Sequence, residues 1–257
     1  MNILITGASS GIGASLAIEY SKKTNVKNIF LFGRNIKHLH YTMKQCKAIG
    51  IKNISISLHS IDVCNKKDMM DEIQQILRKI NTIDIIIANA GISAGITSNL
   101  EKINQIEKIF QTNLNGVINT IQPAIDNMRE KKNGHIVVMS SMASFIPIPK
   151  CPSYCASKVA VRFYAEALST LLAKHNIKTT IVCPGYIKTP LTDANNFYMP
   201  FLMDTKKASR IIVHGINKQL LYIIFPKRLH LLIIIFSLLP KKLKNMFFNS
   251  IRTDKRK

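Results

Sequence analysis

The stretch MNILITGASSGIG, residues 1–13, places three glycines within seven residues, directly after a short apolar run. Residues 3–6 have the composition of a buried strand, and residues 14–20 have the spacing of a helix. Glycines at a strand-to-helix turn let the backbone turn tightly and let a ligand approach it closely. The free N–H groups at the start of the following helix favour a phosphate. The stretch therefore predicts a dinucleotide site, with a simple tight turn as the alternative.

Strand-like and helix-like segments alternate along the rest of the chain. The expected strands are Asn2–Thr6, Asn28–Phe32, Asn53–Leu58, Ile83–Asn89, Gly134–Ser140, Thr179–Cys183 and Leu221–Phe225. The expected helices are Gly13–Lys23, Lys37–Ile49, Lys66–Ile80, Leu100–Arg129, Tyr154–Lys174 and Thr205–Gln219. This alternation predicts one α/β domain over residues 1–225, with a Rossmann-type, doubly wound parallel sheet of about seven strands and helices on both faces.

Polar or glycine-containing turns follow the expected strands. In a doubly wound sheet, ligands bind at the carboxyl ends of the strands. The turns found there are the glycine turn, Gly33-Arg34-Asn35, Asp62-Val63, Asn89-Ala90-Gly91, Ser140-Ser141 and Pro184-Gly185. We expect them to line one site.

The segment CPSYCASK, residues 151–158, places Tyr154 and Lys158 four residues apart on an expected helix. This spacing puts both side chains on one face, so that the ammonium lies near the phenol and lowers its pKa from the usual value of about 10. Such a phenol can exchange a proton with an alcohol or ketone oxygen. Because about one Tyr-x-x-x-Lys pair is expected by chance in this composition, a tyrosine at the edge of an amphipathic helix is the alternative.

Six motifs together resemble the short-chain dehydrogenase/reductase family, in its order and at compatible spacings. They are TGASSGIG (6–13), ANAG (88–91), Asn113 in TNLNG, SS (140–141), YCASK (154–158) and PGYIKT (184–189). The resemblance covers residues 1 to about 195 and follows the compact T-G-x-x-x-G-x-G branch. Where this chain has Ala88, family members often have Asn. The resemblance implies an oxidoreductase that interconverts a ketone and a secondary alcohol by hydride transfer.

The resemblance also implies roles for single residues. Tyr154 would be the catalytic acid/base, Ser141 would orient the substrate oxygen, and Lys158 would lower the pKa of Tyr154 and bind the nicotinamide ribose. Asn113 would fix a water that relays protons to Lys158. The implied cofactor-binding residues are Gly7, Ser9, Ser10, Gly11, Ile12, Gly13, Arg34, Asp62, Val63, Asn89, Ala90, Gly91, Tyr154, Lys158, Pro184, Gly185, Ile187 and Thr189.

Within that set, Asp62 and Val63 would contact the adenine, while Ile187 and Thr189 would hold the nicotinamide carboxamide. Taken singly, Asn113 also fits a helix surface, Asp62 a helix cap and Pro184-Gly185 a turn.

The end of the second strand reads Leu31-Phe32-Gly33-Arg34. An acidic residue there would bind both ribose hydroxyls and repel a 2′-phosphate, but this chain has none, and the Arg34 guanidinium can bind a phosphate through two N–H groups. We therefore predict NADP(H) rather than NAD(H), with a solvated loop arginine as the alternative.

The C-terminal extension, residues 226–257, is basic and apolar. Residues 195–257 carry 13 Lys and Arg against two Asp and Glu, out of a net charge of +22 for the chain. The apolar run Leu229–Leu239 would span about 16 Å as a helix, roughly half of what crossing a membrane requires. It therefore predicts a helix that covers the core, a subunit contact, or peripheral attachment to an anionic membrane surface.

Residues 190–219 are expected to form a lid over the substrate. Its apolar candidates are Leu191, Phe197, Tyr198, Met199, Phe201, Leu202 and Met203, which favour a hydrophobic, lipid-like carbonyl compound. A non-catalytic dinucleotide-binding sensor and a membrane-surface scaffold are the alternative functions.

The remaining features concern compartment and partners. The five cysteines are odd in number, with no C-x-x-C pair, which favours a reducing, cytoplasmic location, at the membrane face if the extension binds lipid. The glycine turn starts too early for a secretory leader. Cys151 and Cys155 flank Tyr154 without a third ligand, so no metal site is expected, and His135, His175 and His214 are expected to be structural or solvated. No clustered aromatic-plus-basic surface indicates nucleic-acid binding. We expect a homo-oligomer.

Overall fold

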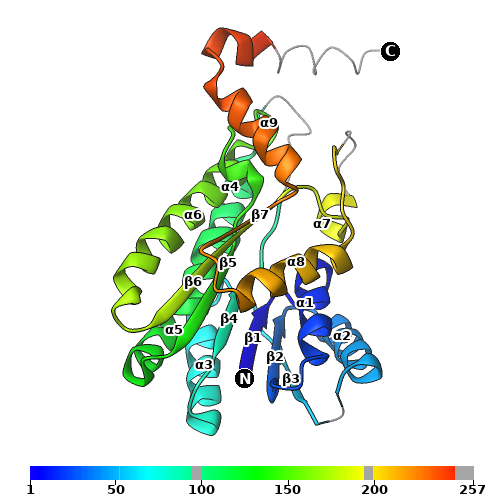
Figure 1. The fold of residues 1–257 in the computed structure, drawn as a ribbon, viewed down its shortest axis with the longest axis vertical. Coiled ribbons are helices and arrows are strands. Elements are labelled where there is room, and N and C mark those ends of the chain that lie inside the picture. Colours follow the sequence, from blue (N-terminus) through cyan, green and yellow to red (C-terminus); the bar gives the residue numbers. More distant parts are fainter. Residues whose placement is uncertain (52, 94–99, 194–198, 247–257) are drawn as a thin grey trace.

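The computed structural model describes residues 1–51, 53–93, 100–193 and 199–246. These residues contain a seven-stranded, entirely parallel sheet in the order β3-β2-β1-β4-β5-β6-β7 (Figure 1). The strands are β1 (Asn2–Thr6), β2 (Asn28–Gly33), β3 (Ser55–Ser60), β4 (Ile85–Ala88), β5 (Gly134–Met139), β6 (Ile177–Pro184) and β7 (Tyr222–Phe225). The expected Rossmann-type fold is confirmed, and each expected strand is present with bounds that shift by at most two residues.

Helices cover both faces of the sheet, as Figure 1 shows. One layer contains α1 (Gly11–Ser21), α2 (Ile36–Ile49) and α8 (Thr205–Asn217). The other contains α3 (Lys66–Ile80), α4 (Ile103–Phe110), α5 (Gly116–Lys131) and α6 (Pro152–Ala173). Shorter elements are the π-helical segment η1 (Gln111–Asn115), the 3-10 turn η2 (Met142–Ser144) and α7 (Pro190–Asp193).

The central strands are apolar along their whole length because both of their faces are covered. In β1, Leu4 packs into one core cluster, while Ile3 and Ile5 pack into the cluster on the opposite face. The edge strand β3, in contrast, has no fully buried residue. The carboxyl ends of the central strands are therefore supported by a well-packed core on both faces of the sheet.

The expected single helix from Leu100 to Arg129 is wrong in detail. The structure begins a helix only at Ile103 and interrupts it with the π-helical segment η1 before α5. The wider turn contains Asn113, whose amide is hydrogen-bonded to the backbone of Ile92 on a different loop. π-helical turns of this kind occur mostly at functional sites.

The second half of the expected lid is part of the helical layer. Helix α8 packs beside α1, with Ala208, Ile212 and Ile216 buried in the core. Residues 190–203 therefore remain as the expected lid segment. Of its apolar candidates, Phe197 and Tyr198 lie outside the described residues.

Helix α9 (Lys227–Leu238) extends away from the rest of the fold, at the end of the molecule opposite the N-terminus (Figure 1). It has no buried residue. The alternative of a helix that covers the core is therefore wrong, because its apolar side chains reach solvent rather than the sheet. Among the described residues, no helix is both long and apolar enough to cross a membrane.

Candidate active site

The glycine turn adopts a backbone shape that side chains would prevent. Gly7 and Gly11 have φ values of +66° and +56°, in the left-handed region that favours glycine. A Cβ atom on Gly13 would lie 2.3 Å from the carbonyl oxygen of Gly7. Gly13 therefore lets α1 pack closely against the turn, whereas Gly7 and Gly11 shape the surface that a ligand would meet.

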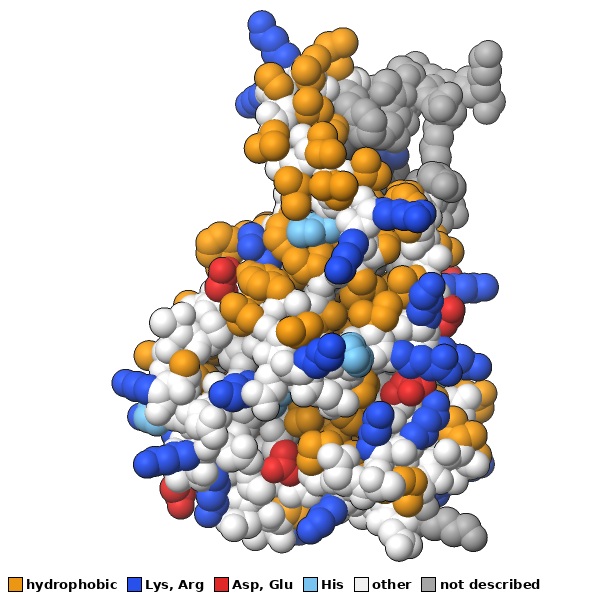
Figure 2. Space-filling model, in the orientation of Figure 1, with side chains coloured by type: hydrophobic (Ala, Val, Ile, Leu, Met, Phe, Trp, Pro, Cys, Tyr) orange, Lys and Arg blue, Asp and Glu red, His pale blue; other side chains and the backbone are white. Residues whose placement is uncertain are grey.

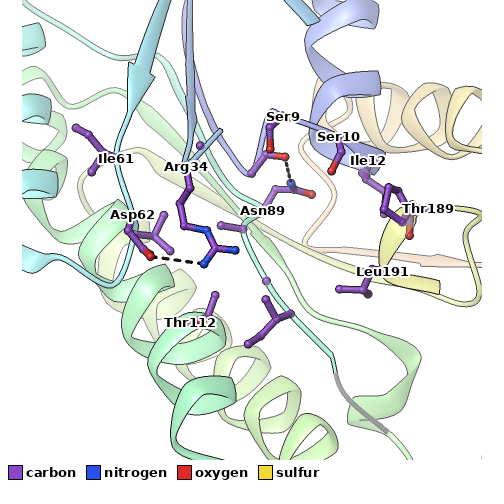
Figure 3. A pocket seen from close by; sticks show the side chains of 18 residues that line it. Ser9, Ser10, Ile12, Arg34, Ile61, Asp62, Asn89, Thr112, Thr189 and Leu191 are labelled. Carbon is purple, nitrogen blue, oxygen red and sulfur yellow. Dashed lines mark hydrogen bonds and ion pairs between the residues drawn. The ribbon is translucent and has the colours of Figure 1, made fainter. Parts of the chain in front are cut away.

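Asn89 connects this turn to the loop after β4. Its Nδ2 atom donates to the carbonyl oxygens of Thr6 (3.0 Å) and Gly7 (3.3 Å), and Figure 3 shows the side chain reaching toward the turn. The Thr6 hydroxyl accepts from the backbone N–H groups of Asn89 (3.1 Å) and Ala90 (3.2 Å). These bonds hold two loops of the site in one fixed arrangement.

A cavity of about 250 Å³ opens between these loops. It is lined by twelve of the predicted cofactor-binding residues: Gly7, Ser9, Ser10, Gly11, Ile12, Arg34, Asp62, Val63, Asn89, Ala90, Gly91 and Thr189. The lining also contains Gly33, expected in one of the turns at the site, and Leu191, expected in the lid. Four lining residues were missed, and each of them is adjacent in sequence to a predicted residue: Ile61, Ile92, Thr112 and Pro190.

Arg34 and Asp62 face each other across this cavity (Figure 3). The Arg34 Nη1 atom lies 3.7 Å from Asp62 Oδ2, and the two side chains are 62% and 41% exposed. An ion pair this exposed is weak. The guanidinium is therefore available to an anionic ligand.

Six predicted cofactor-binding residues lie outside the cavity lining: Tyr154 and Lys158, described below, and Gly13, Pro184, Gly185 and Ile187. Gly13 serves helix packing, as described above, and Pro184 is the last residue of β6. A Cβ on Gly185 would lie 2.9 Å from Leu229 of α9. Ile187 is buried, and its carbonyl oxygen accepts from the Thr192 hydroxyl at 2.7 Å.

Ser141, Tyr154 and Lys158 come together beyond the end of β5. The Ser141 hydroxyl accepts from the Ala143 N–H at 3.1 Å and lies close enough to the Tyr154 phenol to lower its pKa. The Lys158 ammonium lies 5.8 Å from the centre of the Tyr154 ring and donates to the carbonyl oxygen of Met139 at 2.8 Å. One helix thus carries the phenol and the amine, and the loop after β5 carries the hydroxyl.

The expected lowering of the Tyr154 pKa by Lys158 is wrong for the protein without a ligand. Burial raises the pKa of Tyr154 to about 12, against the opposing effect of the Ser141 hydrogen bond. Burial also lowers the pKa of Lys158 to about 8. Desolvation disfavours the charged form of both groups and is the largest cause of each shift. The phenol therefore holds its proton at neutral pH.

Asn113 is fully buried, which excludes the helix-surface alternative. Its Oδ1 atom accepts from the Ile92 N–H at 2.8 Å, and its Nδ2 atom donates to the Ile92 carbonyl oxygen at 2.9 Å and to the Ser157 hydroxyl at 3.0 Å. A Cβ on Gly91 would lie 3.3 Å from Asn113 Oδ1 and 3.4 Å from Lys158 Nζ. Gly91, which lines the cavity, therefore lies next to both Asn113 and Lys158.

Glu101 supports the helix that carries Tyr154, a role the sequence did not reveal. Its carboxylate accepts from the Ser153 N–H (3.1 Å) and the Ser153 hydroxyl (2.9 Å), at the start of α6. The residue before this helix, Cys151, makes no side-chain capping bond. Glu101 thus caps α6 from a segment 52 residues away.

No three His, Cys, Asp or Glu side chains within the described ranges are grouped so that they could hold a metal ion. The site therefore consists of a glycine turn suited to phosphates, a cavity and a phenol–hydroxyl–amine group. The family model of the short chain dehydrogenases matches residues 1–197. The chain belongs to the short-chain dehydrogenase/reductase family.

Known proteins place this dehydrogenase/reductase among oxidoreductases. Epidermal retinol dehydrogenase 2 of Mus musculus is 30% identical over 93% of the chain and 78% of its own length. A short-chain dehydrogenase from Sphingobium yanoikuyae in complex with NADPH superposes with a TM-score of 0.79 at 22% identity, covering 88% of this chain and 87% of that one. A family member from Burkholderia phymatum in complex with NAD gives 0.79 at 20% identity, covering 90% of each chain. At these identities the two structures support the fold alone.

Proposed function

We propose that this protein interconverts a ketone and a secondary alcohol with NADP(H), through Tyr154 as the proton-exchanging group. The observation that carries the proposal is the grouping of Tyr154 with Ser141 and the buried Lys158, whose Nζ atom lies 5.8 Å from the Tyr154 ring centre and next to Gly91 in the cavity wall. The glycine turn at the start of α1 suits the diphosphate of a dinucleotide. The residues present thus fit a nicotinamide dinucleotide, which would supply or accept the hydride.

The chain itself handles the proton. In the reduction direction, Tyr154 donates its proton to the carbonyl oxygen as that oxygen becomes negative, and a pKa of about 12 ensures that the proton is present at neutral pH. The Ser141 hydroxyl accepts from the Ala143 N–H, and its own hydrogen, which otherwise faces the Tyr154 phenol, would be donated to the substrate oxygen. The Lys158 ammonium then stabilises the phenolate that remains.

The preference for NADP(H) rests on Arg34. Family members are known with NADPH and with NAD, so the family does not decide the cofactor of this chain. The cavity places the exposed Arg34 guanidinium where β2 ends, and the chain has no carboxylate at that position. A guanidinium there matches the charge and planar geometry of a 2′-phosphate.

The lid segment supports a hydrophobic substrate. Leu191, Phe201 and Leu202 are between 40% and 46% exposed, although each is large and apolar. A relative of this chain is named as a retinol dehydrogenase, and retinol is a lipid-like alcohol. We therefore propose that the lid packs over a hydrophobic carbonyl compound or alcohol.

The experiment is a panel of ketones and aldehydes, both lipid-like and small, assayed by consumption of NADPH. We expect turnover of hydrophobic members, and a loss of at least about 100-fold in kcat in Tyr154→Phe with NADPH binding retained. If wild type and Tyr154→Phe bind NADPH equally well and neither turns over any member, the protein is a sensor or scaffold instead. Activity restricted to small charged sugars would contradict the lipid-like substrate.

We further propose that the domain of residues 1–225 forms a homo-oligomer in the reducing cytoplasm. Its five cysteines are free, and Phe163 and Leu171 on α6 are each 59% exposed. Large apolar side chains that remain exposed on a helix favour burial against another subunit. Light scattering of the wild type and of Phe163→Gln/Leu171→Gln tests this, and a monomeric wild type contradicts it.

A further inference from the structure

Helix α9 exposes apolar side chains along one broad face. Leu231, Leu232, Ile234, Ile235 and Leu238 are between 42% and 79% exposed. At 3.6 residues per turn, these five positions fall within an arc of about 160°, which is nearly half of the helix surface. Residues 241–246 are also helical, and there Leu243 and Met246 are 47% and 67% exposed. Figure 2 shows this apolar surface as a projection at the top of the molecule.

The first residues of α9 pack against two loops next to the candidate active site. The ring of His230 lies 5.2 Å from the ring of Phe145, in the loop after β5 that also carries Ser141. Leu229 fills the space beside Gly185, after β6. The projecting apolar helix therefore starts from the carboxyl-end edge of the sheet, where the site lies.

Positive charge surrounds this apolar surface. Between residues 205 and 246 there are nine Lys and Arg and not one Asp or Glu. Lys227 and Arg228 begin α9, and Lys241 and Lys242 follow it, all with exposed side chains. Blue side chains lie at the tip of the projection in Figure 2. Apolar side chains flanked by cations match the interface of a bilayer with anionic headgroups.

We propose that α9 and residues 240–246 dock this protein onto a membrane surface that contains anionic lipids. The twelve residues of α9 span about 18 Å, which is too short to cross the hydrocarbon core of about 30 Å but long enough to lie at its boundary. A second copy of the chain fits this surface less well. Two α9 helices packed side by side would bring clusters of Lys and Arg together with no acidic partner on either helix.

Docking of this kind turns the candidate active site toward the lipid. The lid segment exposes Leu191, Phe201 and Leu202, and it begins just after Thr189, a lining residue of the cavity. The carboxyl ends of the strands, the lid segment and α9 lie at one end of the fold (Figure 1). The membrane contact itself does not depend on turnover, so it can be tested without any substrate.

The test is flotation of the full chain with vesicles of phosphatidylcholine alone, or with about 30% phosphatidylserine, since anionic headgroups are the proposed partner. The apolar variant is Ile235→Gln/Leu238→Gln, and its matched control is Tyr41→Gln/Ile49→Gln, two similarly exposed side chains on α2. The charge variant is Lys241→Gln/Lys242→Gln, with Lys66→Gln/Lys67→Gln on α3 as control. Because all of these side chains are exposed, the variants should fold. Circular dichroism verifies that.

We expect the wild type to float with the phosphatidylserine vesicles and to remain largely in solution with phosphatidylcholine alone. The apolar variant should lose at least tenfold in bound fraction, the charge variant should lose its preference for phosphatidylserine, and both controls should behave as wild type. Tyr154→Phe should float like wild type, which separates this proposal from the proposed activity.

Three results would overturn the proposal. The first is a wild type that does not bind either vesicle. The second is equal binding to both vesicle types, which would show that the protein does not recognise anionic lipids. The third is a dimer in solution that Ile235→Gln/Leu238→Gln converts to a monomer while lipid binding is absent, which would make α9 a subunit contact.

Discussion

Replacing Arg34 by Ala tests how this protein would distinguish NADPH from NADH. In the structure, the guanidinium has only a 3.7 Å contact with Asp62. An exposed ion pair of this kind contributes about 0–1 kcal/mol, so turning the side chain toward a phosphate costs little. The loss of NADPH affinity in Arg34→Ala is therefore set by the missing contact between Arg34 and the 2′-phosphate, and not by the missing ion pair with Asp62.

The size of that contact follows from exposure. A hydrogen bond to a charged group is worth about 1.5–3 kcal/mol, and solvent around a side chain that is 62% exposed reduces this to roughly 1–2 kcal/mol. Since about 1.4 kcal/mol corresponds to a factor of ten, Arg34→Ala should raise the Kd and KM for NADPH by about 5- to 30-fold. The kcat should stay within about twofold, because the 2′-phosphate lies at the opposite end of the cofactor from the reacting carbon.

The assay is steady-state kinetics with both cofactors, together with binding measured by nucleotide fluorescence. The KM for NADH should be unchanged in Arg34→Ala, and Arg34→Lys should recover only part of the loss because it keeps the charge without the two-pronged geometry. Added salt should weaken NADPH binding more in the wild type than in the variant. An equal rise in KM for both cofactors, or a 100-fold preference of the wild type for NADH, would refute the role of Arg34.

Three further predictions concern the catalytic group and its support. Burial lowers the pKa of Lys158 to about 8, so its charge is present below that pH and lost above it. The kcat/KM for reduction should therefore fall as pH rises through about 8, and Lys158→Arg should abolish that fall. Gly13→Ala places a Cβ 2.3 Å from the carbonyl oxygen of Gly7, and thermal unfolding should show a loss of about 1–3 kcal/mol; an unchanged midpoint would contradict the packing role. Glu101→Gln removes the negative charge that caps α6 at Ser153, so kcat should fall about fivefold while the KM for NADPH stays unchanged. The control is Glu107→Gln, at an exposed position on α4, which should leave both constants unchanged.

Local patterns were sufficient to predict the sheet. The central strands are short runs of β-branched residues closed by glycine or polar turns, and this signal does not depend on distant parts of the chain. The glycine turn was equally readable, because a left-handed backbone at Gly7 and Gly11 leaves few other residue types. The spacing of Tyr154 and Lys158 likewise placed both on one side of α6.

Features that depend on contacts between distant segments could not be predicted. Glu101 and Ser153 are 52 residues apart, and nothing in the periodicity of either segment indicates the other. The raised pKa of Tyr154 follows from burial, which spacing along one helix does not report. The exposed position of α9 was undecidable for a similar reason, since an apolar run fits a core helix and a projecting helix equally well.

The lid segment is tethered at both ends to parts of the protein that would hold the dinucleotide. It begins next to Thr189, in the wall of the cavity, and it is followed by Thr205, the first residue of α8, whose carbonyl oxygen accepts from the Ser15 hydroxyl on α1 at 3.0 Å. Helix α1 is the helix that starts with the glycine turn. The segment that would enclose the carbonyl compound is thus attached at both ends to elements that would hold the nucleotide. We therefore expect sequential loading, in which the nucleotide binds before the carbonyl compound and leaves after the product.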